Sequence, residues 1–254
     1  MSAGRPLVVG GGARAATLGG KGGAWVALRE LDVASMDEAL RRRVAEAWAR
    51  DALFEHASVA SFSRFSLHLL AVAAPPELVD DAHSAARDEI HHARLCFALA
   101  SAYAGEPLGP GPLPLDGDVL GALDLPSIAA ATVREGCVGE TLASLEAATA
   151  LEHATVPAAR EALSIITEDE ARHAELAWRF VRWALDVGDD NVRAAVSAAF
   201  DEALAAPAPT PAPVDPLDAA LLAHGRLSDA RRQAVLREGL EEVVRPAAAA
   251  LLAR

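Results

Sequence analysis

Apolar side chains recur at three- and four-residue intervals along most of the chain, which is the periodicity of one face of an α-helix. The stripe that includes Glu55, for example, continues through Val59 and Phe62. Proline and glycine interrupt the pattern at a few places and mark the ends of helices. We expect helices at about residues 36–73, 77–104, 126–153, 157–187 and 190–205, followed by a final pair of helical segments within 217–253, the last of them capped by Ser228.

The segment between the second and third expected helices, residues 105–126, is rich in proline and glycine. Twenty extended residues reach about 60 Å at roughly 3.3 Å each. A thirty-residue helix is only about 45 Å long. The segment can therefore return along the whole bundle, which would make the third helix parallel to the second. The short links near 73–77 and 153–157 predict two antiparallel hairpins instead.

These elements predict an all-α protein in three parts. A glycine-rich N-terminal segment at 1–35, expected to be irregular over 1–24, precedes a four-helix bundle at 36–187 with one long crossover. A helical extension follows at 188–254 and contains a proline-rich linker at 206–216.

Composition supports the all-α prediction. Hydrophobic residues make up 52% of the 254 residues and aromatic residues only 4%, so alanine and leucine, both strong helix formers, supply most of the apolar side chains. β-Branched and aromatic residues are too sparse for a protein built of sheets.

Charge and local motifs argue against several classes of function. The 36 acidic residues outnumber the 23 Lys and Arg residues, and the net charge of −13 disfavours nucleic acid as a partner. The stretch GGKGG does not match a phosphate-binding loop, since Ala15 and Gly22 stand where that motif needs Gly and Ser or Thr. No uncharged apolar stretch reaches the roughly 18 residues of a membrane span, and the run PLVV is too short for a signal peptide. With two cysteines and no disulfide framework, we expect a cytoplasmic protein that does not bind membranes.

Glutamate and histidine occur in the same order in the two expected hairpins. In each hairpin, one helix carries a glutamate on its apolar stripe, and the next helix carries a Glu-x-x-His motif about thirty residues later. The repetition indicates an internal duplication about a two-fold axis. The six residues are Glu55, Glu89 and His92 in the first hairpin and Glu140, Glu170 and His173 in the second.

Residues three apart lie on one face of a helix, so the carboxylate and the imidazole of each motif can bind the same metal ion. Four carboxylates and two imidazoles suit two divalent ions, iron or manganese. Because buried carboxylates without a partner are very costly, four of them at one level of a core need a cation. We expect Glu89 and Glu170 to lie between two ions. The other ligands of the first hairpin would bind one ion, and those of the second hairpin the other.

A single Glu-x-x-His motif often arises by chance on a solvent-exposed face, and it is the repetition that favours metal binding. The other acidic residues and histidines near the four helices lack this pattern. We expect surface positions for Glu135, Glu146, Glu161, Glu168 and Glu175, and solvent-exposed or structural roles for His56, His68, His83, His153 and His224.

The arrangement resembles the ferritin-like di-iron carboxylate superfamily over about residues 36–187. Its motifs are similar in form to the Asp-Glu-x-Arg-His motifs of the hydroxylase subunits of bacterial multicomponent monooxygenases. Residues 169–173 match that form fully, whereas in residues 88–92 His91 stands in the place of the arginine.

The resemblance also implies roles for residues beside the ligands. Asp88 would orient His173, and Asp169 would orient His92, each aspartate accepting a hydrogen bond from the imidazole of the opposite motif. Ser144, one turn after the glutamate of the third helix, would place a hydroxyl over the pocket, as a threonine does in the monooxygenases.

By the same resemblance, two iron ions, or manganese ions, would activate O₂ or peroxide, with a small organic substrate and an electron-donor protein as further partners. Two alternatives share the ligand pattern: peroxide removal of the rubrerythrin or manganese-catalase kind, and iron oxidation and storage as in ferritins. The chain has no CxxC pair for a rubredoxin centre, and a compact cage subunit does not need the extension at 188–254. An oxidoreductase is therefore the favoured prediction.

Small residues and cysteines lie close to the motifs. Gly136 and Gly139 fit either a thin wall beside the metal ions or close packing of helices. Cys96 follows the first Glu-x-x-His motif by one turn, and Cys137 precedes the glutamate of the third helix by one turn. If the second and third helices are parallel, the two cysteines lie on opposite sides of the metal layer, too far apart for a disulfide. We expect two free, buried thiols.

Overall fold

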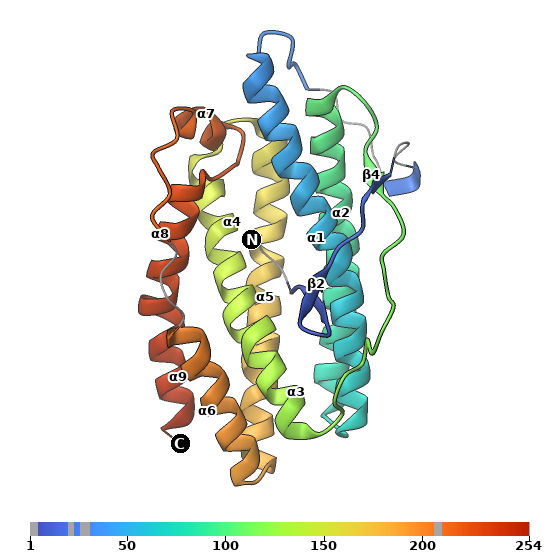
Figure 1. Cartoon of the computed structure of the whole chain (residues 1–254), viewed down its shortest axis with the longest axis vertical. Coiled ribbons are helices and arrows are strands. Elements are labelled where there is room, and N and C mark those ends of the chain that lie inside the picture. The colour runs from blue at the N-terminus through green and yellow to red at the C-terminus, as the bar shows by residue number, and fades with distance from the viewer. Residues whose placement is uncertain (1–4, 20–22, 26–30, 206–209, 254) are drawn as a thin grey trace.

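The computed structural model describes residues 5–19, 23–25, 31–205 and 210–253. Within these ranges the protein is all-α, as predicted, and its long helical segments pack side by side (Figure 1). The bundle consists of α1 (Glu38–Ala71), α2 (Pro76–Ala104), a third segment made of α3 (Leu125–Thr132), the π-helix η2 (Val133–Glu140) and α4 (Thr141–His153), and finally α5 (Pro157–Val187). The C-terminal elements are α6 (Asp190–Ala205), α7 (Asp218–Ala223), α8 (Asp229–Gly239), the π-helix η3 (Leu240–Val244) and α9 (Arg245–Leu252).

The ends of the helices follow from the residues that cap them. Asp37 accepts a hydrogen bond from the Leu40 amide at the start of α1. Gly105 ends α2 with a φ of 79°, a left-handed conformation that suits glycine at a helix C-terminus. Ser228 caps α8, as predicted, by accepting a hydrogen bond from the Arg231 amide.

The long crossover runs along the outside of the bundle from the end of α2 to the start of α3 (Figure 1). The third segment is therefore parallel to α2, which confirms the prediction made from the crossover length. Near its start, strand β4 (Gly109–Pro110) pairs with β3 (Leu18–Gly19) of the N-terminal segment. Further along, the buried His68 of α1 donates a hydrogen bond to the Leu120 carbonyl at 2.7 Å, so His68 has a structural role.

The third segment of the bundle is not a regular α-helix. The sequence predicts one helix over 126–153, but the chain adopts π-helical turns over η2, which ends at Glu140. Such turns are rare and occur frequently at functional sites. Here η2 packs so closely against α5 that a Cβ atom added at Gly136 would collide with the Cβ of Ala177. For Gly136, close packing of helices is therefore the interpretation that the structure supports.

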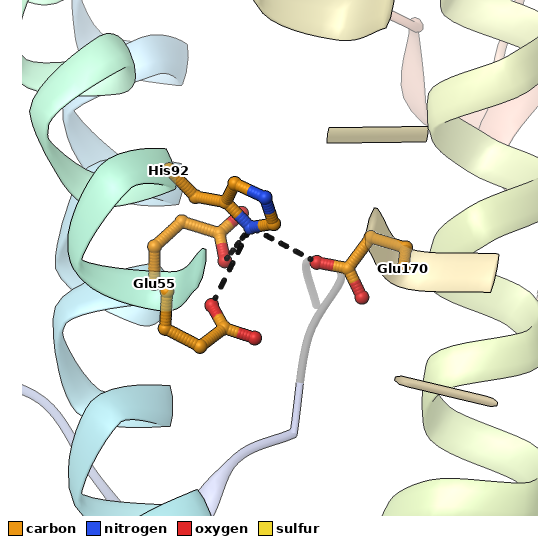
Figure 2. Close-up of side chains that lie close together, drawn as sticks. Glu55, His92 and Glu170 are labelled. Carbon is orange, nitrogen blue, oxygen red and sulfur yellow. Dashed lines mark ion pairs between the residues drawn. The ribbon is translucent and has the colours of Figure 1, made fainter. Parts of the chain in front are cut away.

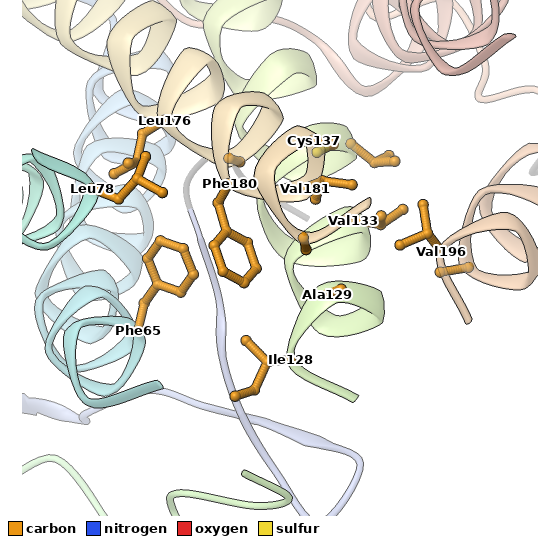
Figure 3. Packing of buried hydrophobic residues seen from close by; sticks show 14 of the residues in the cluster. Phe65, Leu78, Ile128, Ala129, Val133, Cys137, Leu176, Phe180, Val181 and Val196 are labelled. Carbon is orange, nitrogen blue, oxygen red and sulfur yellow. The ribbon is translucent and has the colours of Figure 1, made fainter. Parts of the chain in front are cut away.

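Two clusters of buried apolar side chains fill the bundle, one toward each end. The first includes Phe65 and Phe180 (Figure 3), and the second includes Trp48. Cys137 belongs to the first cluster and Cys96 to the second. Both cysteines are buried and free, which confirms the prediction of two separate thiols.

The N-terminal segment departs from the prediction of an irregular stretch over 1–24. Strand β1 (Leu7–Val9) pairs with β2 (Gly12–Arg14) in an antiparallel hairpin. Leu7 is fully buried, because the hairpin packs against α1. Contacts with the bundle thus override the glycine-rich composition. Residues 1–4 and 20–22, which include the centre of GGKGG, lie outside the described residues.

The C-terminal helices pack against the third segment of the bundle. α6 lies beside α3, and α8 lies beside α4 (Figure 1). A Cβ atom added at Gly239 would lie 2.7 Å from Cδ1 of Leu145, so α8 and α4 approach closely. Of the predicted proline-rich linker, residues 206–209 lie outside the described residues. None of the described helices is long and apolar enough to cross a membrane.

We predict that Gly136→Ala lowers the free energy of unfolding by about 1–3 kcal/mol, the usual cost of overpacking a core, although alanine is the better helix former. The new methyl group would collide with Ala177. Denaturant unfolding followed by circular dichroism measures the change. Gly12→Ala is the control, because its Cβ would come no closer than 3.8 Å to the Val9 carbonyl. Equal stability of Gly136→Ala and the wild type would contradict the close approach of η2 and α5.

Candidate metal centre

The six glutamates and histidines singled out in the sequence lie in one layer between the two apolar clusters. Each is at most 2% exposed. They come from the inward faces of all four bundle segments, so the layer depends on the register of every helix. α1 supplies Glu55, α2 supplies Glu89 and His92, η2 supplies Glu140, and α5 supplies Glu170 and His173.

His92 faces carboxylates from three helices (Figure 2). Its Nδ1 lies 3.5 Å from Oε1 of Glu170, 3.7 Å from Oε2 of Glu89 and 4.0 Å from Oε2 of Glu55. These four residues offer ligand atoms within 4.8 Å of one another. This buried group could therefore hold a metal ion.

His173 faces an overlapping group. Its Nδ1 lies 3.3 Å from Oε1 of Glu89 and 3.8 Å from Oε2 of Glu170. Glu140, Glu170 and His173 also offer ligand atoms within 4.8 Å of one another. Glu89 and Glu170 thus each present one carboxylate oxygen to His92 and the other to His173.

The atoms that face the middle of this layer lack hydrogen-bond partners among the described residues. Buried polar atoms are nearly always hydrogen-bonded, and a buried carboxylate without a partner is very costly. A cation satisfies many acceptors at once, so the residues present fit a metal ion. The unpartnered atoms are Nδ1 of His92 and His173, both oxygens of Glu89, Glu140 and Glu170, and Oε2 of Glu55.

The electrostatics of the layer require either protons or a cation. Burial and the neighbouring carboxylates raise the pKa of Glu55 and Glu140 well above the ordinary value. Burial alone would lower the pKa of His92 and His173, but hydrogen bonds to carboxylates raise it well above the ordinary value. Without a metal ion, the layer therefore holds protons on several of its groups, and metal binding must displace them.

Aspartates contact the outer nitrogens of both histidines. Nε2 of His92 lies 2.9 Å from Oδ2 of Asp169, and Nε2 of His173 lies 3.4 Å from Oδ2 of Asp88. These pairs are the ones expected from the motifs. An Nε2–H group that donates to an aspartate leaves the lone pair of Nδ1 free for a metal ion, and the aspartate raises the basicity of the ring.

A single arginine contacts both aspartates. Arg172 hydrogen-bonds Asp169 and lies 3.5 Å from Asp88. His91, which stands where the first motif would have its own arginine, is exposed. Although the first motif has His91 in place of an arginine, both aspartates therefore still have a cationic partner in Arg172.

The remaining predicted residues have mixed positions. His224 has a structural role, because its Nδ1 lies 2.8 Å from the Tyr103 hydroxyl. Ser144 is half-buried and is not among the described residues that line the cavity beside Glu55. His56 is half-buried against the ring of Trp25. The predictions of exposure are confirmed for Glu161, Glu168, Glu175, His83 and His153.

The surface positions predicted for two glutamates are wrong. Glu135 is partly buried and pairs with Arg5 at 3.3 Å and Arg64 at 2.9 Å. Glu146 is buried and lies 3.2 Å from Nε of Arg232. Three of the elements involved, the N-terminal segment, α1 and α8, are far from these glutamates in the sequence, so helical periodicity could not reveal the contacts.

Sequence reasoning also missed Arg5, which lies on the His173 side of the layer. Arg5 is 2% exposed, and its guanidinium carbon lies 4.1 Å from the ring centre of Phe65 and 5.5 Å from that of Phe62. Phe62 in turn packs against His173 with 4.9 Å between the ring centres. The Ser58 hydroxyl of α1 donates to the Arg5 carbonyl at 3.0 Å and anchors the segment. No local pattern distinguishes this arginine in a glycine-rich stretch.

We predict that Asp169→Asn weakens metal binding about 10–100-fold, the usual cost of losing such a hydrogen-bond partner. The variant keeps all six candidate ligands but no longer fixes the His92 ring through an ionised acceptor. Competition with a chelator of known affinity measures the change. Asp186→Asn is the matched control on α5, where Asp186 pairs with Arg182 at the surface. Equal affinities of Asp169→Asn and wild type would contradict the role of Asp169.

Comparison of the chain with protein-family models, with curated proteins and with solved structures found no match. The case for a function therefore comes from the chemistry of the buried layer.

Proposed function

We propose that this protein is a non-haem oxidoreductase that uses two iron ions, or manganese ions, to activate O₂ or peroxide. The observation that carries the proposal is the position of Glu89 and Glu170. Each of these carboxylates has one oxygen near His92 and the other near His173. A carboxylate in that position can bridge two ions. Four carboxylates also offset the charge of two divalent ions, and the ions would in turn remove the repulsion among the carboxylates.

The other residues would divide between the two ions. Glu55 and His92 would hold one ion. Glu140 and His173 would hold the other. Carboxylate and imidazole ligands of this kind suit divalent iron and manganese.

When bound, a pair of such ions would supply the redox chemistry that O₂ or peroxide requires. The chain itself would orient the ligand side chains and limit the access of water. Asp88 and Asp169 hold the two imidazoles with Nδ1 toward the centre of the layer. The apolar clusters exclude bulk water above and below the layer. Repeated turnover needs electrons from outside, and we propose a separate electron-donor protein as their source.

Cavity size favours a second candidate, the removal of peroxide without an organic substrate. A cavity of about 40 Å³ lies beside Glu55, and one of about 130 Å³ reaches His173 from the seam between α2 and α5. Both are smaller than the roughly 300 Å³ at which ordinary ligand pockets begin. Peroxide needs no larger space, whereas a small organic substrate would require the bundle to open.

Anaerobic loading with Fe(II) should give about two ions per chain, and O₂ or H₂O₂ should then oxidise them with a change in the ultraviolet–visible spectrum. His173→Ala should bind less metal because it removes a ligand. His153→Ala is the control, because His153 is exposed on α4, and this variant should bind as much Fe(II) as the wild type.

The same samples separate the candidates. Rapid loss of H₂O₂ in the manganese form would identify peroxide removal. A native mass of a 12-mer or 24-mer that accumulates iron would identify storage instead. If the wild type binds no Fe(II), or if bound Fe(II) survives O₂ and H₂O₂ unchanged, the proposed function is wrong.

A further inference from the structure

A small charged cavity separates the metal layer from the C-terminal helices. It has a volume of about 40 Å³, and its lining includes Glu55 of the layer, Asp51 of α1, Glu146 of α4, and Arg226 and Arg232 from the C-terminal part of the chain. All five residues are at most 9% exposed. We call it the Glu146 cavity.

Two ion pairs contribute to the walls of the Glu146 cavity. Arg226 hydrogen-bonds Asp51, and its guanidinium carbon lies 4.3 Å from the ring centre of Trp48. Arg232 places Nε 3.2 Å from Oε2 of Glu146. Since both arginines follow α7, the C-terminal extension closes one side of the cavity and holds both carboxylates in place.

The pairs do not use all the polar atoms of the cavity. Oδ1 of Asp51, Oε2 of Glu55 and Nε of Arg226 have no hydrogen-bond partner within the described part of the chain. At roughly 10–15 Å³ for each, the volume suits a few water molecules. Donors and acceptors on the walls would order these waters into a path between Glu146 and Glu55.

We propose that the Glu146 cavity carries protons to the Glu55 side of the metal layer, with Glu146 as the residue that takes up and releases them. The inference rests on the proposed function. Reduction of one H₂O₂ to two H₂O breaks the O–O bond and takes up two electrons and two protons. Oxidation of two Fe(II) to Fe(III) accounts for the electrons. The protons need a polar path, because the apolar clusters seal the layer above and below.

The surroundings of Glu146 suit a proton-transfer group. Burial raises the pKa of Glu146 to about 7; Arg232 and Arg226 oppose this shift, and Asp51 adds to it. α5 lines the cavity with apolar side chains, and α2 contributes the Cys96 thiol, which burial keeps neutral by raising its pKa. A carboxyl whose pKa lies near the working pH can both hold a proton and release it.

The direct test is Glu146→Gln, which keeps the shape of the side chain but cannot donate a proton as an acid. The rate of H₂O₂ reduction by the iron-loaded wild type should fall as the pH rises through about 7, since Glu146 then loses the proton that it donates. Glu146→Gln should react about 100-fold or more slowly, as expected for the loss of a general acid, and should lack this pH dependence. Glu146→Asp should recover part of the rate, and Glu152→Gln, exposed on the same helix, should behave like the wild type.

Infrared spectroscopy of the zinc-loaded protein gives a readout without turnover, since Zn²⁺ has no redox chemistry. The wild type should show the C=O band of a protonated carboxyl that disappears as the pH rises through about 7. This band should be absent from Glu146→Gln.

The outcomes distinguish this inference from the proposed function. If the iron-loaded wild type reduces neither O₂ nor H₂O₂, the proposed function fails and the proton path fails with it. If the wild type is active and Glu146→Gln keeps its rate and pH profile, only the proton path is wrong, and the cavity at His173 becomes the remaining route. Equal infrared spectra for the wild type and Glu146→Gln would also overturn the role of Glu146.

Discussion

Burial of four carboxylates at one level of the bundle is the constraint on which the rest of this structure depends. Glu55, Glu89, Glu140 and Glu170 lie together out of contact with water, and like charges in such a place cannot all stay ionised without compensation. The two histidines offset part of the charge, but most of the inward-facing oxygens remain without hydrogen-bond partners. A fold that concentrates acceptors in this way, with apolar packing on both sides, could hold a cation, and a cation bound there would stabilise it.

The same constraint explains why the segments outside the four helices place arginines beside the buried layer. The N-terminal segment brings Arg5 over the aromatic rings next to His173, and the C-terminal extension brings Arg226 and Arg232 to the cavity beside Glu55. Each of these buried arginines pairs with a carboxylate that is not a candidate ligand. The additions thus close two sides of the layer with cations and leave its own oxygens free for a metal ion.

Much of this arrangement follows from local features of the sequence. Proline, glycine and apolar periodicity predict the helices to within a few residues, and the repeated Glu-x-x-His motif predicts which side chains share a layer. Long-range contacts are not encoded locally: the positions of Glu135 and Glu146 depend on arginines from the N-terminal segment, α1 and α8. The π-helical turns of η2 also escape prediction, because apolar periodicity does not distinguish them from an α-helix; the close approach of Gly136 to α5 is likewise visible only in the folded chain.

A crystal structure of the iron-loaded protein, with anomalous diffraction measured on both sides of the iron absorption edge, tests the central claim most directly. We expect two iron peaks per chain, about 3.5–4 Å apart as in other two-metal sites. Both should lie between Glu89 and Glu170, one beside Nδ1 of His92 and the other beside Nδ1 of His173. An iron-soaked crystal with no anomalous peak in this layer, and with its carboxylates hydrogen-bonded to one another, would contradict the claim that the bundle is built around a pair of metal ions.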